Sequence, residues 1–171
     1  HSTVNRWVIR YTPQLEQAFH NKKKQPGNRW RLDETYVKVK GYWRYYYRAV
    51  YKQNNTIAFL LTTKRDKKAA LRFLTKAIGR NGQPSFITLD KSGANKAGIN
   101  GYNKVNHRRI KIRQCKYMNN IVEQDHRFIK RKTKLVLGFK NFHAAQKTLA
   151  GVELIRMLKK GQQRKTRGDV F

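Results

Sequence analysis

The sequence predicts an α/β fold in which a mixed sheet of five strands carries helices on its faces. Two observations lead to this prediction. Apolar residues make up 39% of the 171 residues, which is enough for a buried core in a chain of one-domain length. Three strand-like segments follow one another early in the chain, and later strand-like segments alternate with helix-like ones. Such an order is typical of a mixed sheet with helices packed against it.

Residues 1–20 are expected to form a helix, because apolar residues recur at three- and four-residue spacing. These apolar positions are Val4, Trp7, Val8, Tyr11 and Leu15. Pro13 lies inside the pattern and is expected to break or kink the helix. Residues 21–28 then form a basic, turn-rich linker.

Three meandering strands are expected next. They span Arg29–Lys40, Tyr42–Lys52 and Thr56–Thr63. Gly41 and the pair Asn54-Asn55 suit the tight turns between them. The second strand carries the aromatic residues Trp43, Tyr45, Tyr46 and Tyr47. These offer a surface on which nucleobases can stack, although alternating aromatic residues in a strand more often belong to the core.

The second half of the chain alternates helices and strands. Asp66 is expected to cap a helix with one apolar stripe, which ends near Gly82. That stripe consists of Ala70, Phe73, Leu74, Ala77 and Ile78. Two short strands, a short helix between them and two further helices follow. The strands are Ser85–Leu89 and Arg109–Gln114, and the later helices run from Asn119 or Asn120 to about Lys134 and from Phe142 to about Lys160. The resulting order, β-β-β-α-β-α-β-α, is the ribonuclease-H-like arrangement, and residues 161–171 are left as a loose basic tail.

The charge of the chain indicates its partner. Forty Lys and Arg residues against nine Asp and Glu residues give a net charge of +31, spread along the whole chain. Nucleic acid is the expected partner, because the release of counterions drives binding to phosphates. A membrane surface is a weaker alternative, since no segment is a lone basic amphipathic helix and none has the roughly 20 apolar residues of a membrane span. The single Cys115 excludes an internal disulfide and fits a reducing, cytoplasmic compartment.

Two of the nine acids occupy unusual positions. Asp33 lies inside the first strand among apolar neighbours, and Asp90 directly follows the apolar run Phe86–Leu89. A carboxylate in such a place is costly unless it is paired or bound to metal. The first and fourth strands of a ribonuclease-H-like sheet are neighbours, so we expect these two acids to meet.

A third acid is expected from the helix that begins near Asn120. On a helical wheel Glu123 lies opposite the apolar side, on the face of Arg127 and Lys130. Asp125 lies near the centre of the apolar side and is expected to be buried with an Arg or His partner. The wheel alone does not show which of the two acids reaches Asp33 and Asp90.

Three converging carboxylates suit one kind of chemistry. Cleavage of a phosphodiester needs an activated nucleophile and a stabilised leaving oxygen, and two divalent ions provide both. Mg²⁺ prefers hard oxygen ligands, so carboxylates are the expected protein ligands. His107 and His143 have no ligand-like spacing to Cys115, so a zinc site is not expected.

Three sequence blocks resemble the DDE transposases of bacterial insertion sequences, specifically the IS-six group. The blocks are Leu32–Tyr36 (LDETY), Leu89–Gly93 (LDKSG) and Lys116–Arg127 (KYMNNIVEQDHR). The resemblance implies that Asp33, Asp90 and Glu123 are the catalytic and metal-binding triad, which selects Glu123 over Asp125. It also implies two Mg²⁺ or Mn²⁺ ions, cleavage at the ends of the element, and strand transfer into target DNA by a homo-oligomer assembled on DNA near the nucleoid.

The same resemblance implies a helix-turn-helix ahead of the catalytic domain. Residues 1–20 are then its C-terminal remnant, and residues 29–160 are the DDE catalytic domain. The expected DNA contacts are Asn5, Arg6, Lys91, Arg127, Lys130 and Arg131. His126 is either a packing histidine or a residue that orients a phosphate or water.

One departure from the family stands out. Tyr51 occupies a position where members usually carry Asp, which raises the alternative of an inactive transposase remnant that only binds DNA. A ribonuclease H or a resolvase is the other alternative on this fold, although those families lack the block Lys116–Arg127.

Overall fold

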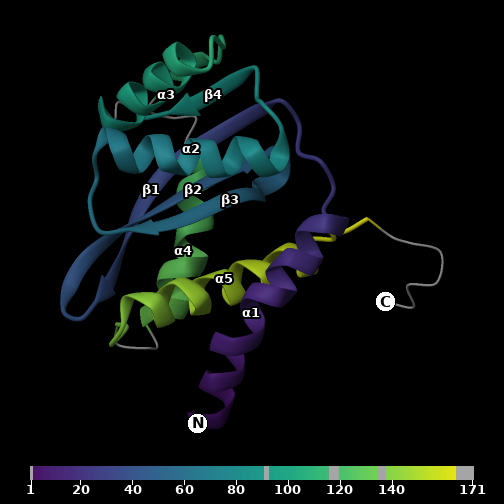
Figure 1. Ribbon diagram of the computed structural model, residues 1–171, viewed down its shortest axis with the longest axis vertical. Helices are drawn as coiled ribbons and strands as arrows, with labels where there is room; N and C mark the ends of the chain where they lie inside the picture. The colour runs from purple at the N-terminus through teal and green to yellow at the C-terminus, as the bar shows by residue number, and fades with distance from the viewer. Residues whose placement is uncertain (1, 91–92, 116–119, 135–137, 165–171) are drawn as a thin grey trace.

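The computed structural model describes residues 2–90, 93–115, 120–134 and 138–164, and its centre is a five-stranded sheet in the order β3-β2-β1-β4-β5 (Figure 1). The strands are β1 (Arg29–Val39), β2 (Tyr42–Tyr51), β3 (Asn55–Thr62), β4 (Phe86–Leu89) and β5 (Lys111–Gln114). The first three are antiparallel neighbours, whereas β4 runs parallel to both β1 and β5. The predicted mixed sheet is therefore confirmed, and each strand lies within two residues of its expected bounds.

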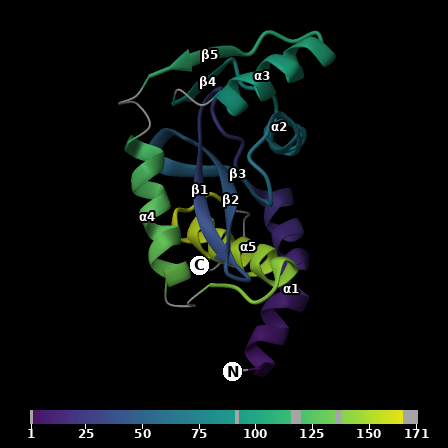
Figure 2. The same cartoon turned by 90° about the vertical axis from the view of Figure 1, so that its left-hand side faces the viewer.

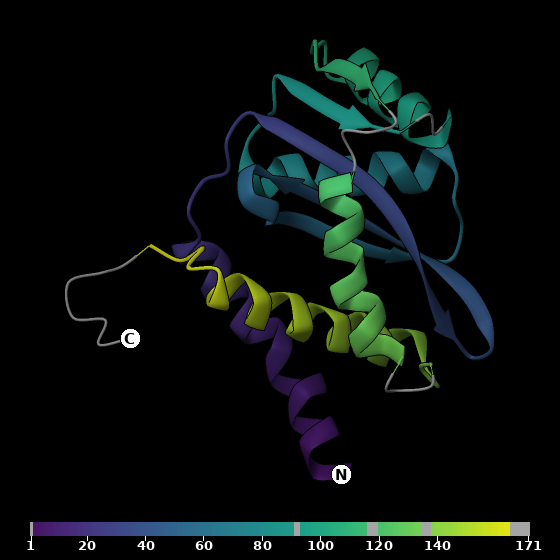
Figure 3. The ribbon, with the colours of Figure 1, turned by 180° about the vertical axis from the view of Figure 1, so that it is seen from behind.

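Helices cover both faces of the sheet. One face carries α2 (Lys67–Asn81) and α3 (Gly93–Val105), and the other carries α1 (Ser2–Lys22), α4 (Asn120–Lys134) and α5 (Phe142–Lys159). Figures 2 and 3 show α4 on the side of the sheet away from α2. Within the described residues, no helix combines the length and the apolar character needed to cross a bilayer.

Each face has its own hydrophobic core, because alternate side chains of a strand point to opposite faces. On the α2 face, Leu32 of β1 and Phe73 of α2 are buried in one cluster. On the α5 face, Val37 of β1 and Leu149 of α5 are buried in another. The predicted stripe of α2 is buried along its whole length, and the carboxylate of Asp66 accepts the Ala69 amide at 2.7 Å as the expected cap. This pattern fixes which side chains of β1 face α4.

Three local predictions were wrong. Pro13 does not break the helix, because α1 runs continuously through Lys22, and the connecting segment is therefore shorter than residues 21–28. Packing against α5 supports the helix where Pro13 lacks a hydrogen-bond donor: a Cβ at Gly151 would lie 3.2 Å from the Thr12 hydroxyl. The start of the expected loose tail is docked, because the Gln162 side chain exchanges two hydrogen bonds of 2.9 Å with the backbone of Thr56. The helix after β4 is α3, which has 13 residues rather than being short.

Candidate active site

The parallel pairing of β1 with β4 brings the first two predicted acids to one edge of the sheet. Arg31 of β1 is aligned with Thr88 of β4. Asp33 lies two residues beyond Arg31, and Asp90 lies two residues beyond Thr88. The two acids are therefore level with each other where β4 ends, which is the end of parallel strands at which ligand sites gather.

The third predicted acid is on α4, which stands against β1 on the face of the sheet away from α2 (Figure 3). Glu123 lies in the first turn of α4, and its side chain is exposed. Together with Asp33 and Asp90 it lines a cavity of about 480 Å³. The same cavity is lined by Arg65, His126, Arg127 and Lys130, among others. Three carboxylates from segments far apart in the sequence thus share one cavity with cationic residues at its border.

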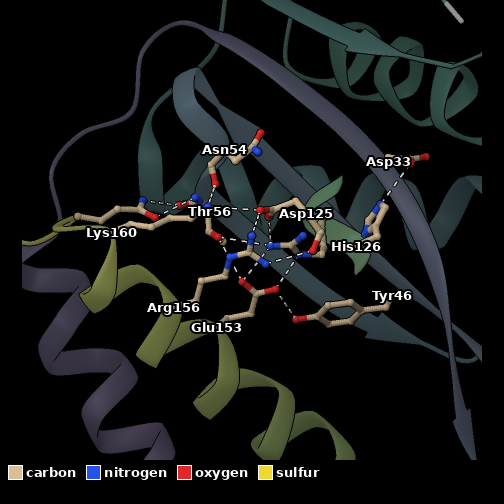
Figure 4. Close-up of polar contacts among 11 residues, drawn as sticks. Asp33, Tyr46, Asn54, Thr56, Asp125, His126, Glu153, Arg156 and Lys160 are labelled. Atoms are coloured by element: carbon tan, nitrogen blue, oxygen red, sulfur yellow. Dashed lines mark hydrogen bonds and ion pairs between the residues drawn. The ribbon is translucent and has the colours of Figure 1, made fainter. Parts of the chain in front are cut away.

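His126 contacts the first of these acids. Its Nε2 lies 3.2 Å from Oδ2 of Asp33, and the residue is only 4% exposed (Figure 4). The contact ties α4 to β1 inside the cavity. It favours the interpretation of His126 as a residue that orients a group of the site, here the carboxylate of Asp33, over a merely packing histidine.

Glu34 also lines this cavity, and the sequence reasoning did not single it out. Its side chain accepts a hydrogen bond of 2.6 Å from Asn95 and forms an ion pair with Arg65. Burial raises the pKa of Glu34 against the opposing effects of Asn95 and Arg65, and the nearby charges of Asp33 and Asp90 raise it further. The signal that was available is that Glu34 directly follows Asp33 in the block LDETY, in a chain with only nine acids.

A second group of acids, Asp125 and Glu153, lies inside the protein (Figure 4). Asp125 is fully buried, pairs with the guanidinium of Arg48 at 2.5 Å, and also pairs with Arg156 of α5. The carboxylate of Glu153 on α5 accepts two hydrogen bonds from Arg48, one of 2.6 Å from Nε and one of 3.1 Å from Nη2. The helical wheel placed Asp125 correctly as a buried acid with an Arg partner. Burial alone would lower the pKa of Arg48, but the neighbouring carboxylates raise it, so the guanidinium at the centre of the network stays charged.

This network determines how α4 is presented to the cavity. Because Asp125 is fixed to β2 and α5, the rotation of α4 about its axis is fixed as well. Glu123 precedes Asp125 by two residues, a rotation of about 200° at 100° per residue, and so lies on the opposite side of the helix. The burial of one acid of α4 thereby exposes the other to the cavity.

The predicted DNA contacts are distributed over several surfaces. Arg127 and Lys130 line the acidic cavity. Arg131 is exposed on α4 but does not line that cavity, and Arg6 is exposed on α1, far along the chain from the acids. Asn5 lies within α1, but its side chain, like all of Lys91, is outside the described residues. The structure thus brings two of the six residues to the acids.

Tyr51 is half-buried at the end of β2, where it pairs with Asn55 of β3 and packs against the core of the α2 face. It does not line the cavity of the acids.

The aromatic residues that precede Tyr51 in β2 differ in how far they are buried. Tyr46 and Tyr47 are completely buried, as the core interpretation predicted, whereas Trp43 is 62% exposed.

The donor set suits divalent cations that prefer oxygen, since the acids of the cavity offer carboxylate oxygens and no thiolate. Among the described residues, no three His, Cys, Asp or Glu side chains are grouped so as to hold one ion together. The carboxylate oxygens that line the cavity therefore fit divalent cations.

A ribonuclease-H-like sheet with one carboxylate inside its first strand and a second at the end of its fourth strand defines a class of protein, the polynucleotidyl transferases. Comparison with known proteins gives the family. Residues 27–162 match a family described as a DDE domain. The transposase for the insertion sequence-like element IS431mec of Staphylococcus aureus is 38% identical over 170 residues, which cover 96% of this chain and 72% of the relative. The chain belongs to the DDE transposases of the IS-six family.

Solved structures agree in fold. The catalytic core domain of HTLV-2 integrase in complex with magnesium superimposes with a TM-score of 0.58 at 20% identity, covering 77% of this chain and 85% of that chain. A chain of the simian T-cell lymphotropic virus intasome in complex with the PP2A regulatory subunit B56 gamma gives a TM-score of 0.56 at 18% identity. That match covers 76% of this chain but about half, 48%, of the intasome chain. The likeness confirms the ribonuclease-H-like fold predicted from the order of elements.

Proposed function

We propose that this domain cleaves DNA at the ends of an insertion sequence and joins them to target DNA, using Asp33, Asp90 and Glu123 to hold two divalent ions. The observation that carries the proposal is the shared cavity of these three acids, which is open to solvent, whereas Asp125 and Glu153 are buried and paired with Arg48. Family membership supports the reaction class.

Each acid has its own part in the proposal. Asp33 would hold both ions, Asp90 would complete the ligands of one, and Glu123 would complete those of the other. When bound, Mg²⁺ or Mn²⁺ activates the attacking oxygen and stabilises the leaving oxygen of the phosphodiester. His126 keeps the Asp33 carboxylate oriented through the 3.2 Å contact. In the absence of cations the three carboxylates repel one another, so binding of the ions also relieves that repulsion.

The basic residues at the border of the cavity hold the DNA backbone. Arg127 and Lys130 project from the same face of α4 as Glu123 and line the same cavity. Phosphates placed between them and the acids are held close to the reacting centre. Binding weakens steeply with salt, since each phosphate contacted adds about 0.9 to the slope of log affinity against log salt.

Residues 2–22 supply a second contact with DNA. In this proposal α1 is the last helix of a helix-turn-helix unit, and Asn5 and Arg6 contact the terminal sequence of the element. The N-terminal half of α1 extends away from the body of the domain (Figure 1), which leaves Arg6 exposed. A homo-oligomer assembled on the two DNA ends brings them together for joining.

The test is the joining of a labelled element end to a target plasmid in Mg²⁺. Asp33→Asn, Asp90→Asn and Glu123→Gln are each expected to lower the joining rate at least about a thousandfold, because each removes a charged ligand of the reacting centre. Asp66→Asn is the matched control, since Asp66 caps α2 outside the cavity. Binding of the same DNA is expected to stay within about twofold of wild type. Wild-type joining by all three variants would show that the triad is assigned wrongly, and binding without joining by the unaltered protein would favour an inactive remnant.

A further inference from the structure

A second cavity lies next to the acids and contains none of them. Its volume is about 890 Å³, and residues of the hairpin of β1 and β2 and of the C-terminal half of α4 line it. We call it the aromatic groove. It is lined by Tyr36, Lys38, Trp43, Tyr45, Lys130 and Lys134, together with Val37, Thr133 and Gly138. No acidic residue is among the described residues that line it.

The register of the hairpin creates the aromatic side of the groove. Tyr36 of β1 is paired with Tyr45 of β2, and Lys38 is paired with Trp43, so these four side chains share one face of the hairpin. The rings of Tyr36 and Tyr45 are 5.4 Å apart, and the Lys38 ammonium lies 5.9 Å from the centre of the Trp43 ring. Tyr36 is 44% exposed and Trp43 is 62% exposed. Large aromatic surface is therefore presented to solvent beside a positive charge.

The groove adjoins the cavity of the acids. Tyr36 and Lys130 line both, so a nucleotide next to a phosphate in the acidic cavity lies close to the aromatic groove. Lysines on both the strand side and the helix side, Lys38 and Lys134, extend the positive charge along it. Charge and position favour a polyanion as the occupant over an apolar segment of protein.

The exposed aromatic rings indicate whether that polyanion is double-stranded or single-stranded nucleic acid. The bases of a duplex are already stacked on their neighbours and cannot place a ring against Trp43. Unpaired bases have free ring faces, and stacking on exposed aromatic side chains combined with a basic track is how single strands are bound without sequence preference. We propose that the aromatic groove binds unpaired nucleotides of the DNA strand next to the phosphate at the acids, with bases stacked on Trp43 and Tyr36.

The inference rests on the proposed function for its orientation toward the acids, but its test does not require catalysis. Binding is measured without divalent cations by fluorescence anisotropy, with a blunt duplex and with the same duplex carrying a short single-stranded oligothymidine extension. Trp43→Ala is expected to weaken binding of the extended DNA about tenfold, in the range found for loss of a base-stacking residue, and binding of the blunt duplex less than about twofold. Trp43→Phe is expected to restore most of the loss.

Tyr42→Ala is the matched control, because Tyr42 is more exposed than Trp43, at 68%, and does not line the groove. Photocrosslinking from 5-iododeoxyuridine in the extension is expected to mark Trp43 or Tyr36. Equal weakening of both DNAs, no weakening, or crosslinks confined to other surfaces would overturn the inference. So would a change from oligomer to monomer caused by Trp43→Ala in the absence of DNA, since a second copy of the chain would then be the occupant. Failure of strand transfer by the wild-type protein would leave this result standing and count against the proposed function alone.

Discussion

Two acidic clusters meet on α4, and they differ in what balances their charge. Asp125 is buried and is matched by two arginines of the protein itself. Glu123, on the other side of the helix, is exposed to a cavity that Asp33, Glu34 and Asp90 also line. A buried acid with internal cations holds elements together. Carboxylates that converge in an open cavity can take up divalent cations, and this difference separates the structural acids from the candidate catalytic ones.

The buried cluster can be tested by removing its central cation. Arg48→Met leaves Asp125 and Glu153 in the interior without their shared partner, because all three side chains are fully buried. We expect the free energy of unfolding to fall by about 3–5 kcal/mol, measured by urea denaturation. The exposed Arg72 provides the control variant Arg72→Met. Equal effects of the two substitutions would show that the network does not hold the domain together.

The link between the two clusters and the reaction is His126, and we expect it to affect the rate more than the stability. His126→Asn removes the contact with Asp33, so the carboxylate is no longer held in one orientation. Residues that orient metal ligands typically contribute 10–100-fold to activity or metal affinity. We therefore expect joining to slow by about that factor and to require more Mg²⁺ for half-maximal rate.

His143 is the control for this substitution, because it is exposed at the start of α5 and does not line the acidic cavity. His143→Asn is expected to keep both the rate and the Mg²⁺ requirement. A His126→Asn protein that lost stability but kept its Mg²⁺ requirement would make His126 a packing residue.

The sequence predicted those parts of this comparison that depend on local periodicity. The order of elements also predicted a ribonuclease-H-like sheet, in which the first and fourth strands are neighbours. That was sufficient to expect Asp33, inside the first strand, to meet Asp90, directly after the fourth. The helical wheel was sufficient to assign Asp125 to the interior. It was not sufficient to select Glu123 as the third acid, and the family resemblance supplied that choice.

The remainder depends on contacts between distant segments, which no local pattern encodes. Arg48 is separated from Glu153 by 105 residues along the chain, and nothing near Arg48 indicates that this strand residue is fully buried. The exposure of Trp43 beside the buried Tyr46 and Tyr47 follows from where the helices stop covering the hairpin. Pro13 was misjudged because packing on α5 outweighs a missing hydrogen bond.

Glu16 on α1 is half-buried and belongs to neither cluster, and it predicts how the stability of the domain depends on pH. Burial alone would raise the pKa of Glu16, but the hydrogen bond with His20 and the charges of Lys76 and Arg80 lower it to about 2. A carboxyl whose pKa is depressed on folding stabilises the protein above the pKa of the unfolded chain, 4.5, and loses this contribution as pH falls toward 2. We expect Glu16→Gln to cost at most about 2 kcal/mol at neutral pH, after allowance for solvent screening. The difference from wild type should shrink below pH 4.5 in urea titrations, and a difference independent of pH would contradict the assignment.

The smallest expected effect is on stability, and it distinguishes the role of a carboxylate's charge from the role of its oxygen as a hydrogen-bond acceptor. Asp66 belongs to neither cluster, and its carboxylate accepts the Ala69 amide at the start of α2. An amide oxygen can accept the same hydrogen bond, whereas a methyl group cannot. We therefore expect Asp66→Ala to lower the free energy of unfolding by about 1 kcal/mol and Asp66→Asn to change it by only a few tenths of a kcal/mol.

In the acidic cavity the same replacement of a carboxylate by an amide is expected to abolish joining, because Asn keeps the hydrogen-bonding geometry of Asp but not the charge that divalent cations require. If Asp66→Asn were as costly as Asp66→Ala, the charge at the helix terminus would matter more than the cap, and Asp66 would have to be grouped with the acids whose charge is essential.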